Sequence, residues 1–268
     1  MDNSHPRKRI WLWILAAVLL LLAAGGLWFF LQYWSSGTTP LPGGRTDPSA
    51  ATTPPVTGTT VPAETTTTAP LPDNPVDFKT LQTTNPDVYA WLYIPNTNID
   101  YPVAQSSDMG DDFYLDHNIY REYEFAGMIF SEKQNGRTFL SRNTVLYGHN
   151  MLNGTMFRTL HYFEDEEFFN ANPVFYIYTP GHILTYTIFS AYEYDDRHLL
   201  NSFDYHNDQV WEEYLAYARN PKSMVALTRP DVPVTKSDRI VTLSTCVGYN
   251  GNMRYLVQGV LTDDQPTK

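Results

Sequence analysis

The chain contains one cysteine, Cys246, among 268 residues. A single cysteine cannot form an intramolecular disulfide, and the sequence has no Cys-X-X-Cys pair. No two histidines have the spacing of a His-Glu-X-X-His zinc motif. We therefore expect neither a structural metal nor a cofactor. In a protein outside the cytoplasm, Cys246 is then either buried and inert or a free, reactive thiol.

Basic side chains are also scarce, with 18 lysines and arginines against 29 aspartates and glutamates. Residues 1–34 hold three of the basic and one of the acidic side chains, so the rest of the chain carries 15 against 28, a net charge of −13. A domain this acidic repels a phosphate backbone, and we exclude nucleic acid as its partner. We interpret the excess negative charge as a contribution to solubility.

Charge is absent from Ile10–Leu31, which is apolar apart from two glycines. A run of this length crosses a hydrocarbon core as a helix. Trp28, Tyr33 and Trp34 suit the interface at its far end. We therefore predict a transmembrane helix over residues 10–34 that anchors the protein in the cell membrane as a single-pass protein.

Three basic residues precede this run, and none follows it until Arg45. The positive-inside rule then predicts a cytoplasmic tail over residues 1–9 and an extracellular location for everything after residue 34. The alternative is a cleaved signal peptide, because Ala23-Ala24-Gly25 is small enough for a peptidase. The apolar run is longer than a usual signal core, which favours the anchor.

Large apolar side chains are rare in residues 35–75, which are rich in Thr, Pro, Gly, Ser and Ala. Such a composition cannot offset the entropy lost on ordering the chain. We expect an extended stalk that separates the membrane from an extracellular domain over residues 76–268. The sequence leaves open whether this stalk is glycosylated.

The outer domain contains eight short apolar runs broken by turn residues, the pattern of β-strands. These runs are Leu92–Ile94, Ile99–Ala104, Gly127–Phe130, Thr144–Tyr147, Val174–Tyr178, Ile183–Tyr192, Ile240–Thr245 and Tyr255–Leu261. Pro180-Gly181 predicts a hairpin turn before the sixth run. Eight strands joined mostly by loops predict a closed or nearly closed β-barrel, so the fold class is mainly β with helices.

Three helices are expected in the outer domain, one before the first strand and two between strands. Asn85-Pro86-Asp87 predicts the start of a short helix that continues to about Trp91. A second helix is expected over Thr155–Tyr162. The third, Asp208–Arg219, lies in the long connection between the sixth and seventh strands and has Asn207 as its cap. Its apolar stripe consists of Val210, Trp211, Tyr214, Leu215 and Ala218.

Cys246 and Arg254 are expected at the same rim of the sheet. Cys246 is placed where one predicted strand ends and Arg254 where the next begins, with a glycine- and asparagine-rich connection between them. Adjacent antiparallel strands bring such positions together. The planar donors of Arg254 suit a substrate carbonyl or a developing oxyanion, although a surface charge at a strand start has the same position.

A cysteine nucleophile needs a basic neighbour, because the thiolate is the reactive form and is scarce at neutral pH for an ordinary thiol. Of the seven histidines, His149 is best placed, since it follows the strand Thr144–Tyr147 and a flexible Gly148. Any one histidine can equally be a surface or core residue. A cysteine with histidine and arginine as helpers indicates acyl transfer.

The cysteine segment resembles a known family. Thr242–Cys246 reads TLSTC and, with Arg254 at the next strand start, is similar to the TLxTC and arginine signature of the sortases. Tyr147–Asn150, which reads YGHN, resembles the histidine segment of that family. Similarity to the class B branch is carried by the long helix-bearing connection and by Asn98–Val103, Tyr114-Leu115 with His117-Asn118, and Asn153–Phe157. The likeness spans residues 76–261.

This resemblance implies an eight-stranded sortase-type barrel and a membrane-bound cysteine transpeptidase of Gram-positive bacteria. Cys246 is then expected to attack the Thr carbonyl of a Thr-Gly bond in the C-terminal sorting signal of a secreted protein. His149 would protonate the leaving amine and later deprotonate the incoming one, while Arg254 would orient the substrate and stabilise the oxyanion. An amine of a cell-wall peptide precursor or of a pilin lysine would resolve the thioacyl intermediate. Leu115, Ser244 and Thr245 are expected to line the substrate groove.

Two other functions remain open on the residues alone. A stalked extracellular cysteine peptidase would use the same three groups and give the acyl group to water. A non-catalytic surface-binding domain would keep Cys246 as a structural residue. Product analysis with an added amine separates the first from a transpeptidase, and labelling of Cys246 by a thiol reagent separates the second.

Overall fold

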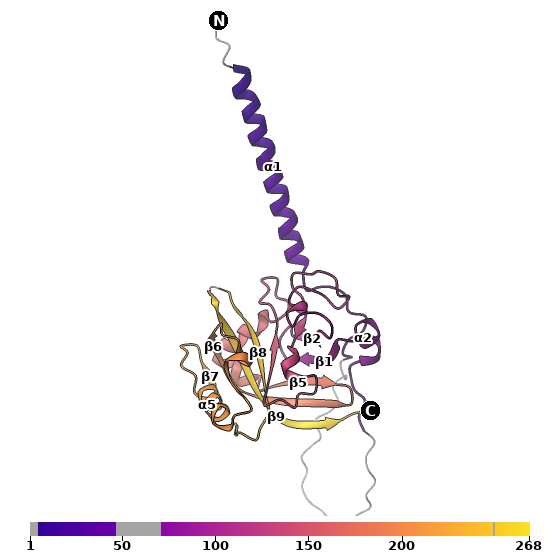
Figure 1. Cartoon of the computed structure of the whole chain (residues 1–268), viewed down its shortest axis with the longest axis vertical. Coiled ribbons are helices and arrows are strands. Elements are labelled where there is room, and N and C mark those ends of the chain that lie inside the picture. The colour runs from indigo at the N-terminus through magenta and orange to yellow at the C-terminus, as the bar shows by residue number, and fades with distance from the viewer. Residues whose placement is uncertain (1–4, 47–70, 249) are drawn as a thin grey trace, which may run out of the picture.

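The structure is a computed structural model that describes residues 5–46, 71–248 and 250–268. Its main part is a β-barrel from which one long helix projects (Figure 1). Residues 1–4 of the expected cytoplasmic tail and residues 47–70 of the expected stalk lie outside the described residues.

Eight strands close into a ring, which confirms the barrel predicted from the sequence. The ring runs from β5 through β1, β2, β3, β4, β8 and β9 to β6, and β6 pairs back with β5. The strands are β1 (Val88–Tyr93), β2 (Asp100–Ala104), β3 (Ile129–Phe130), β4 (Asn143–Tyr147), β5 (Val174–Thr179), β6 (His182–Asp195), β8 (Ile240–Val247) and β9 (Asn250–Pro266). A two-residue strand, β7 (Leu227–Thr228), pairs with β6 as an addition to the ring.

The strands β6 and β9 are longer than the apolar runs predicted, at 14 and 17 residues. The whole of β6 pairs with residues 253–266 of β9, with register shifts between Thr185 and Tyr186 and between Ile188 and Ser190. Such bulges bend a strand and increase its twist, which lets one pair follow the curve of the barrel. The predicted turn at Pro180-Gly181 joins β5 to β6, and Gly181 has the positive φ of 89° that favours glycine.

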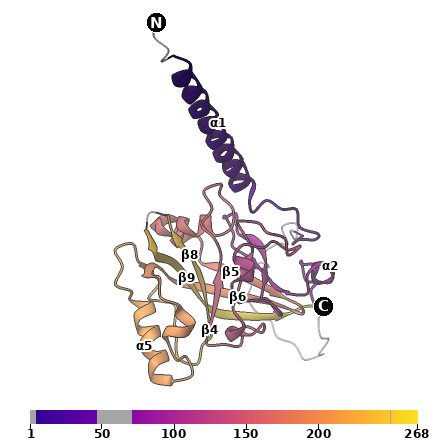
Figure 2. The same ribbon diagram turned by 45° about the horizontal axis from the view of Figure 1, so that its top comes forward.

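The helix predicted over Asp208–Arg219 is confirmed as α5. The Asn207 side chain accepts hydrogen bonds from the N–H groups of Gln209 and Val210, so it caps the helix as expected. Buried apolar residues of α5 pack with residues of β4, β6, β8 and β9 in a second core outside the barrel. Figure 2 shows α5 at the lower left of the barrel. This helix therefore supports the outer face of the strand that carries Cys246.

The prediction of a helix from Asn85 to Trp91 is wrong, because the helix lies earlier in the chain. The helix α2 spans Phe78–Thr84 and is capped by the Asp77 carboxylate, which accepts from the Thr80 N–H. Asn85 ends this helix, and its side-chain oxygen accepts from the Asp87 N–H in a turn. The chain from residue 88 onward pairs with β2 as β1 instead of continuing as a helix, because its backbone groups find partners in the sheet.

The helix expected over Thr155–Tyr162 is a 3₁₀ helix, η3, at Arg158–Glu164. Four further short segments had no sequence prediction, because three to six residues give too little periodicity to recognise. They are η1 (Phe113–Leu115), η2 (Lys133–Asn135), α3 (Glu166–Ala171) and α4 (Leu199–Ser202).

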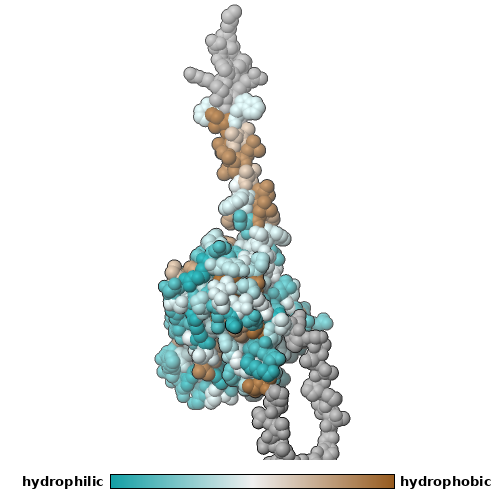
Figure 3. All heavy atoms as spheres, turned by 90° about the vertical axis from the view of Figure 1, so that its right-hand side faces the viewer, coloured by the Kyte–Doolittle hydropathy of each residue, from teal (hydrophilic) through white to brown (hydrophobic). Residues whose placement is uncertain are grey.

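The helix α1 spans His5–Ser35 and stands away from the barrel (Figure 1). Within it, Trp13–Ser35 is long and apolar enough to cross a membrane. The described apolar side chains of this span are exposed and are seen along the helix in Figure 3, as expected for a surface that would face lipid.

Residues 36–46 lie on the barrel, in contrast to the extended stalk expected there. The Gly37 N–H donates to Glu124 over 2.5 Å. Arg45 forms an ion pair of 2.9 Å with Asp100 and stacks over the ring of Tyr93. These residues find polar partners on the domain surface, which the low apolar content of the segment did not reveal.

Candidate active site

The pairing of β4 with β8 brings the histidine and cysteine segments together. These strands are parallel, with Tyr147 opposite Ser244. Parallel strands end at the same edge of a sheet, so the turn after β4, at Gly148 and His149, lies beside the end of β8. Cys246 is the penultimate residue of β8, one residue further into the strand than the sequence indicated.

Arg254 faces Cys246 across the next strand pair. The two residues are direct partners in the antiparallel ladder between β8 and β9, and the register shifts immediately after Cys246. The guanidinium of Arg254 donates to the carbonyls of Gly251 and Met253 over 2.9 and 3.1 Å. These contacts hold a positive charge at the rim where the nucleophile was expected.

One cavity of about 320 Å³ collects all six residues predicted for the site. They are Leu115, His149, Ser244, Thr245, Cys246 and Arg254. Its other wall is formed by residues 194–199, at the end of β6 and the start of α4. Cys246 is half-buried rather than enclosed in the core. The three groups proposed for catalysis therefore share one opening, while their chemical roles stay a prediction.

The three residues predicted for the substrate groove differ in exposure. Leu115 is 42% exposed and presents an apolar surface to the cavity. Ser244 and Thr245 are only 5% and 2% exposed. The Thr245 hydroxyl donates to the Gly148 carbonyl over 2.8 Å, so this side chain connects the two strand ends.

The imidazole of His149 is oriented by a backbone carbonyl. Its Nε2 lies 2.9 Å from the Leu115 oxygen. A carbonyl can only accept, so Nε2 carries the proton and Nδ1 is the basic nitrogen of the neutral ring. Burial lowers the pKa of His149 below its ordinary 6.5, against the opposing effects of the Leu115 carbonyl and the Asp116 carboxylate. The ring is therefore neutral at neutral pH, with Nδ1 unprotonated.

Two glycines allow the close packing behind His149. A Cβ on Gly148 would lie 2.6 Å from the Ile129 Cδ1 atom and 2.9 Å from the ring of Phe157. Gly127 has a φ of 57°, and a Cβ there would collide with the Leu115 carbonyl that binds His149. Larger residues at either place would displace the imidazole or its partner.

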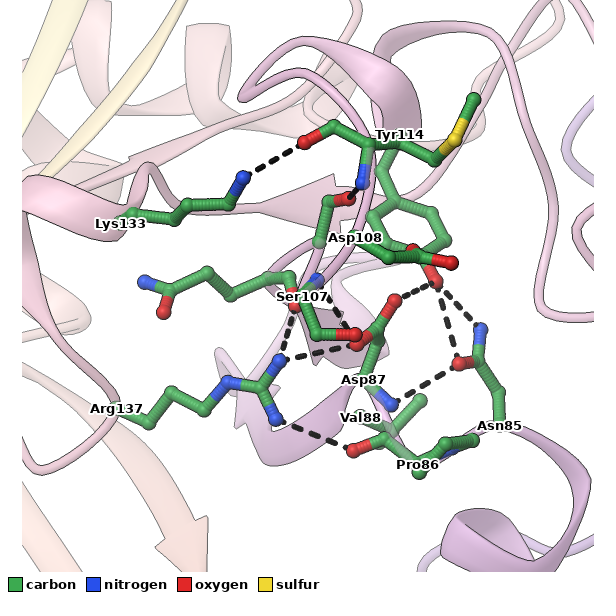
Figure 4. A network of polar contacts seen from close by, with 12 residues as sticks. Asn85, Pro86, Asp87, Val88, Ser107, Asp108, Tyr114, Lys133 and Arg137 are labelled. Carbon is green, nitrogen blue, oxygen red and sulfur yellow. Dashed lines mark hydrogen bonds and ion pairs between the residues drawn. The ribbon is translucent and has the colours of Figure 1, made fainter.

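A buried network fixes the segment that supplies this carbonyl (Figure 4). The Asp87 side chain is 1% exposed and pairs with Arg137 over 3.0 Å. It also accepts from the Tyr114 hydroxyl over 2.8 Å and from the Ser107 N–H over 3.1 Å. Burial opposes ionisation of Asp87, but the hydrogen bonds from Ser107, Tyr114 and Arg137 outweigh it, so the pKa of Asp87 is lowered. Tyr114 directly precedes Leu115, so a stable carboxylate helps to place the partner of His149.

A second histidine contacts the backbone of the nucleophile. The Nε2 atom of His161, in η3, lies 3.1 Å from the Cys246 carbonyl oxygen, and its Nδ1 lies 2.5 Å from Glu164. Asn150 donates to the same carbonyl over 2.8 Å. The sequence analysis counted His161 among seven histidines and did not select it. The three-residue spacing to Glu164 was its only local signal.

Comparison with known proteins identifies this arrangement. A family model described as a sortase domain matches residues 92–262. Sortase B of Listeria monocytogenes is 37% identical over 172 residues, which cover 63% of this chain and 67% of that protein. The chain belongs to the sortase family, in its class B branch. Sortase B of Staphylococcus aureus is 32% identical over 169 residues, with the same coverage of 63% and 67%.

Solved class B sortases share the barrel. The structure of Clostridium perfringens sortase B superposes with a TM-score of 0.63 at 36% identity and covers 70% of this chain and 100% of that chain. A Staphylococcus aureus sortase B–substrate complex gives a TM-score of 0.60 at 30% identity, with coverage of 69% and 84%. Sortases are cysteine transpeptidases that act at the cell surface on proteins with sorting signals and use cell-wall amines as acceptors. The expected class of enzyme is thereby confirmed.

Proposed function

We propose that this sortase cleaves a Thr-Gly bond in the sorting signal of a secreted protein and joins the threonine to an amine. Cys246 attacks the threonine carbonyl and forms a C–S bond. His149 takes the thiol proton of Cys246 during this attack and passes it to the leaving glycine amine as the C–N bond breaks. The incoming amine loses its proton to His149 and displaces the thiolate. The acceptor is an amine of a cell-wall peptide precursor or a pilin lysine.

The observation that carries this proposal is that Cys246, His149 and Arg254 line one cavity. Arg254 is the cation placed to stabilise the oxyanion of each tetrahedral intermediate, because it is the cross-strand partner of Cys246. The neutral His149 has Nδ1 as its basic atom, so it can accept the proton that the Cys246 thiol releases.

The test is product formation from a Thr-Gly peptide and an added amine by the full-length chain. We expect a new amide at the threonine, detected by mass spectrometry, and loss of product in Cys246→Ala. Replacing His149 or Arg254 with Ala should lower kcat/KM by roughly 10²-fold or more each. Formation of the hydrolysed acid alone at saturating amine would contradict the transpeptidase, and near-normal turnover of Arg254→Ala would contradict the oxyanion role.

We further propose that α1 anchors the enzyme with residues 1–9 in the cytoplasm and the barrel outside. The apolar span Trp13–Ser35 and the basic residues before it support this orientation. Protease added to intact protoplasts should digest the barrel and leave a short membrane-bound fragment. A barrel that is protected until the cells are lysed would reverse the orientation.

A further inference from the structure

The end of the membrane helix and the imidazole of His149 contact the same side chain, Phe125. The ring of Tyr33, in the last turn of α1, lies 5.2 Å from the ring of Phe125 between centroids. The ring of Phe125 is stacked on that of His149, with 5.4 Å between centroids and 17° between planes. Both distances are within the range of favourable aromatic contacts.

The last turn of α1 is fixed to the barrel around this contact. The Tyr33 hydroxyl accepts from the Leu152 N–H over 3.2 Å. Asn153 donates to the Trp34 and Ser36 carbonyls over 2.8 and 2.9 Å. Leu152 and Asn153 belong to the loop that follows His149. The helix end is thus attached to the same loop as the imidazole.

We propose that Phe125 is a positioning residue for His149 and that Tyr33, through the docking of α1, holds Phe125 in place. The Leu115 carbonyl fixes one ring nitrogen of His149 but leaves the ring free to tilt about that hydrogen bond. The stacked Phe125 ring restricts this tilt. Phe125 is itself 38% exposed, so it depends on Tyr33 for part of its own packing. The inference rests on the proposed catalytic role of His149.

The stack also shields the imidazole from water. Burial is the largest cause of the lowered pKa of His149, so removing the Phe125 ring should bring that pKa back toward 6.5. Asp116, which forms an ion pair with His117, and the Leu115 carbonyl act in the opposite direction. The remaining titratable or charged side chains around the cavity are Tyr147, Tyr194, Asp195, Asp196, Arg197, His198, Cys246 and Arg254. All of these residues are retained in the Phe125 variants.

The experiment compares Phe125→Leu, Phe125→Tyr and Tyr33→Ala in the full-length chain in detergent micelles. We expect Phe125→Leu to lower kcat by about 10-fold with little change in KM, because the imidazole is misplaced while the groove is intact. Its His149 pKa, followed by NMR of the imidazole, should rise. Phe125→Tyr keeps a ring in the stack and should restore both values. Tyr33→Ala should act in the same direction with a smaller effect.

Two matched controls remove aromatic rings that do not stack on Phe125. Tyr123→Ala changes a 71% exposed ring two residues away, and Trp34→Ala changes a ring that stacks on Phe30 of its own helix. Both should leave kcat and the His149 pKa unchanged. The double variant Tyr33→Ala/Phe125→Leu should be no slower than Phe125→Leu alone, because Tyr33 acts on His149 only through the Phe125 ring.

An unchanged kcat and an unchanged His149 pKa in Phe125→Leu would overturn the positioning role, and strictly multiplicative effects in the double variant would overturn the role of Tyr33. If Phe125→Leu does not fold, kcat and the His149 pKa of Tyr33→Ala test the proposal instead, and unchanged values of both would overturn it. A fully active His149→Ala would instead overturn the proposed function. Inactive His149→Ala with unaffected Phe125 variants would overturn this inference alone.

Discussion

The Thr245 hydroxyl donates a hydrogen bond of 2.8 Å to the Gly148 carbonyl. Thr245 precedes Cys246, and Gly148 precedes His149, so this bond connects the residues next to the nucleophile and the base. It reinforces the parallel pairing of β4 and β8 at the point where both strands end.

Thr245→Val should therefore reduce activity without unfolding the barrel. Valine fills the same volume but leaves the Gly148 carbonyl without this donor, which should lower the free energy of unfolding by about 1 kcal/mol. We expect kcat/KM to fall by roughly 10-fold as the turn at His149 loosens. Thr262→Val, which removes an exposed hydroxyl bonded to Thr187, is the control and should match the wild type in peptide assays and thermal melts. Wild-type kinetics in Thr245→Val would show that the turn needs no such support.

The imidazole of His149 should titrate below pH 6.5. Its pKa is lowered mainly by burial, so the unfolded chain binds this proton more readily than the folded one. The contribution of neutral His149 to stability is therefore present above pH 6.5 and is lost as pH falls below it. NMR of the His149 ring gives the midpoint of its titration directly. In His149→Gln, the free energy of unfolding should lack this part of the pH dependence seen in the wild type. A midpoint at or above 6.5 would contradict the assigned burial.

Asp87→Asn should destabilise the barrel at neutral pH. The carboxylate is buried and accepts from Arg137, Tyr114 and Ser107, so the amide loses charge-assisted bonds and the free energy of unfolding should fall by about 2 kcal/mol. Because the pKa of Asp87 is lowered in the folded state, this contribution is present above the ordinary value of 3.8 and is lost as pH falls through the lowered one.

Denaturant melts at several pH values test this, with Asp264→Asn as the control. Asp264 pairs with His182, but its side chain is 45% exposed, so the loss of its charge should have little effect. A difference between wild type and Asp87→Asn that grows below pH 4 would contradict the ionised network.

His161→Ala should slow the reaction by about 10-fold through the backbone of Cys246, which loses one partner of its carbonyl. The rate at which iodoacetamide labels Cys246 should change in this variant together with the rate of the reaction. His182→Ala is the matched control, because His182 also pairs with a carboxylate, Asp264, at 2.7 Å but lies at the far hairpin. If His161→Ala and His182→Ala had equal reaction and labelling rates, His161 would have no role in positioning Cys246.

The barrel, α5 and the pairing of Cys246 with Arg254 were predictable because they depend on local patterns. Strand periodicity, the Asn207 cap and a short connection between two strands are all visible within about 20 residues. The start of α2 was missed because Asp77 and Asn85 are both plausible caps, and only pairing of β1 with β2 decides between them.

The parallel pairing of β4 with β8 joins residues about 100 positions apart, and no local signal predicts it. The roles of Phe125, His161 and Asp87 follow from this tertiary arrangement. Residues 36–46 were expected to be extended because of their composition, yet Glu124 and Asp100 bind them. Composition describes what a segment can do alone and does not include the surface beside it.

The central claim is that Cys246 carries the acyl group, and mass spectrometry of the trapped enzyme tests it most directly. The full-length chain is mixed with a Thr-Gly peptide without an amine acceptor, quenched in acid and digested. The fragment containing Cys246 should gain the mass of the peptide up to its threonine, as a thioester that an added amine releases. Cleavage of the peptide by Cys246→Ala, or an adduct on any other residue, would contradict the account.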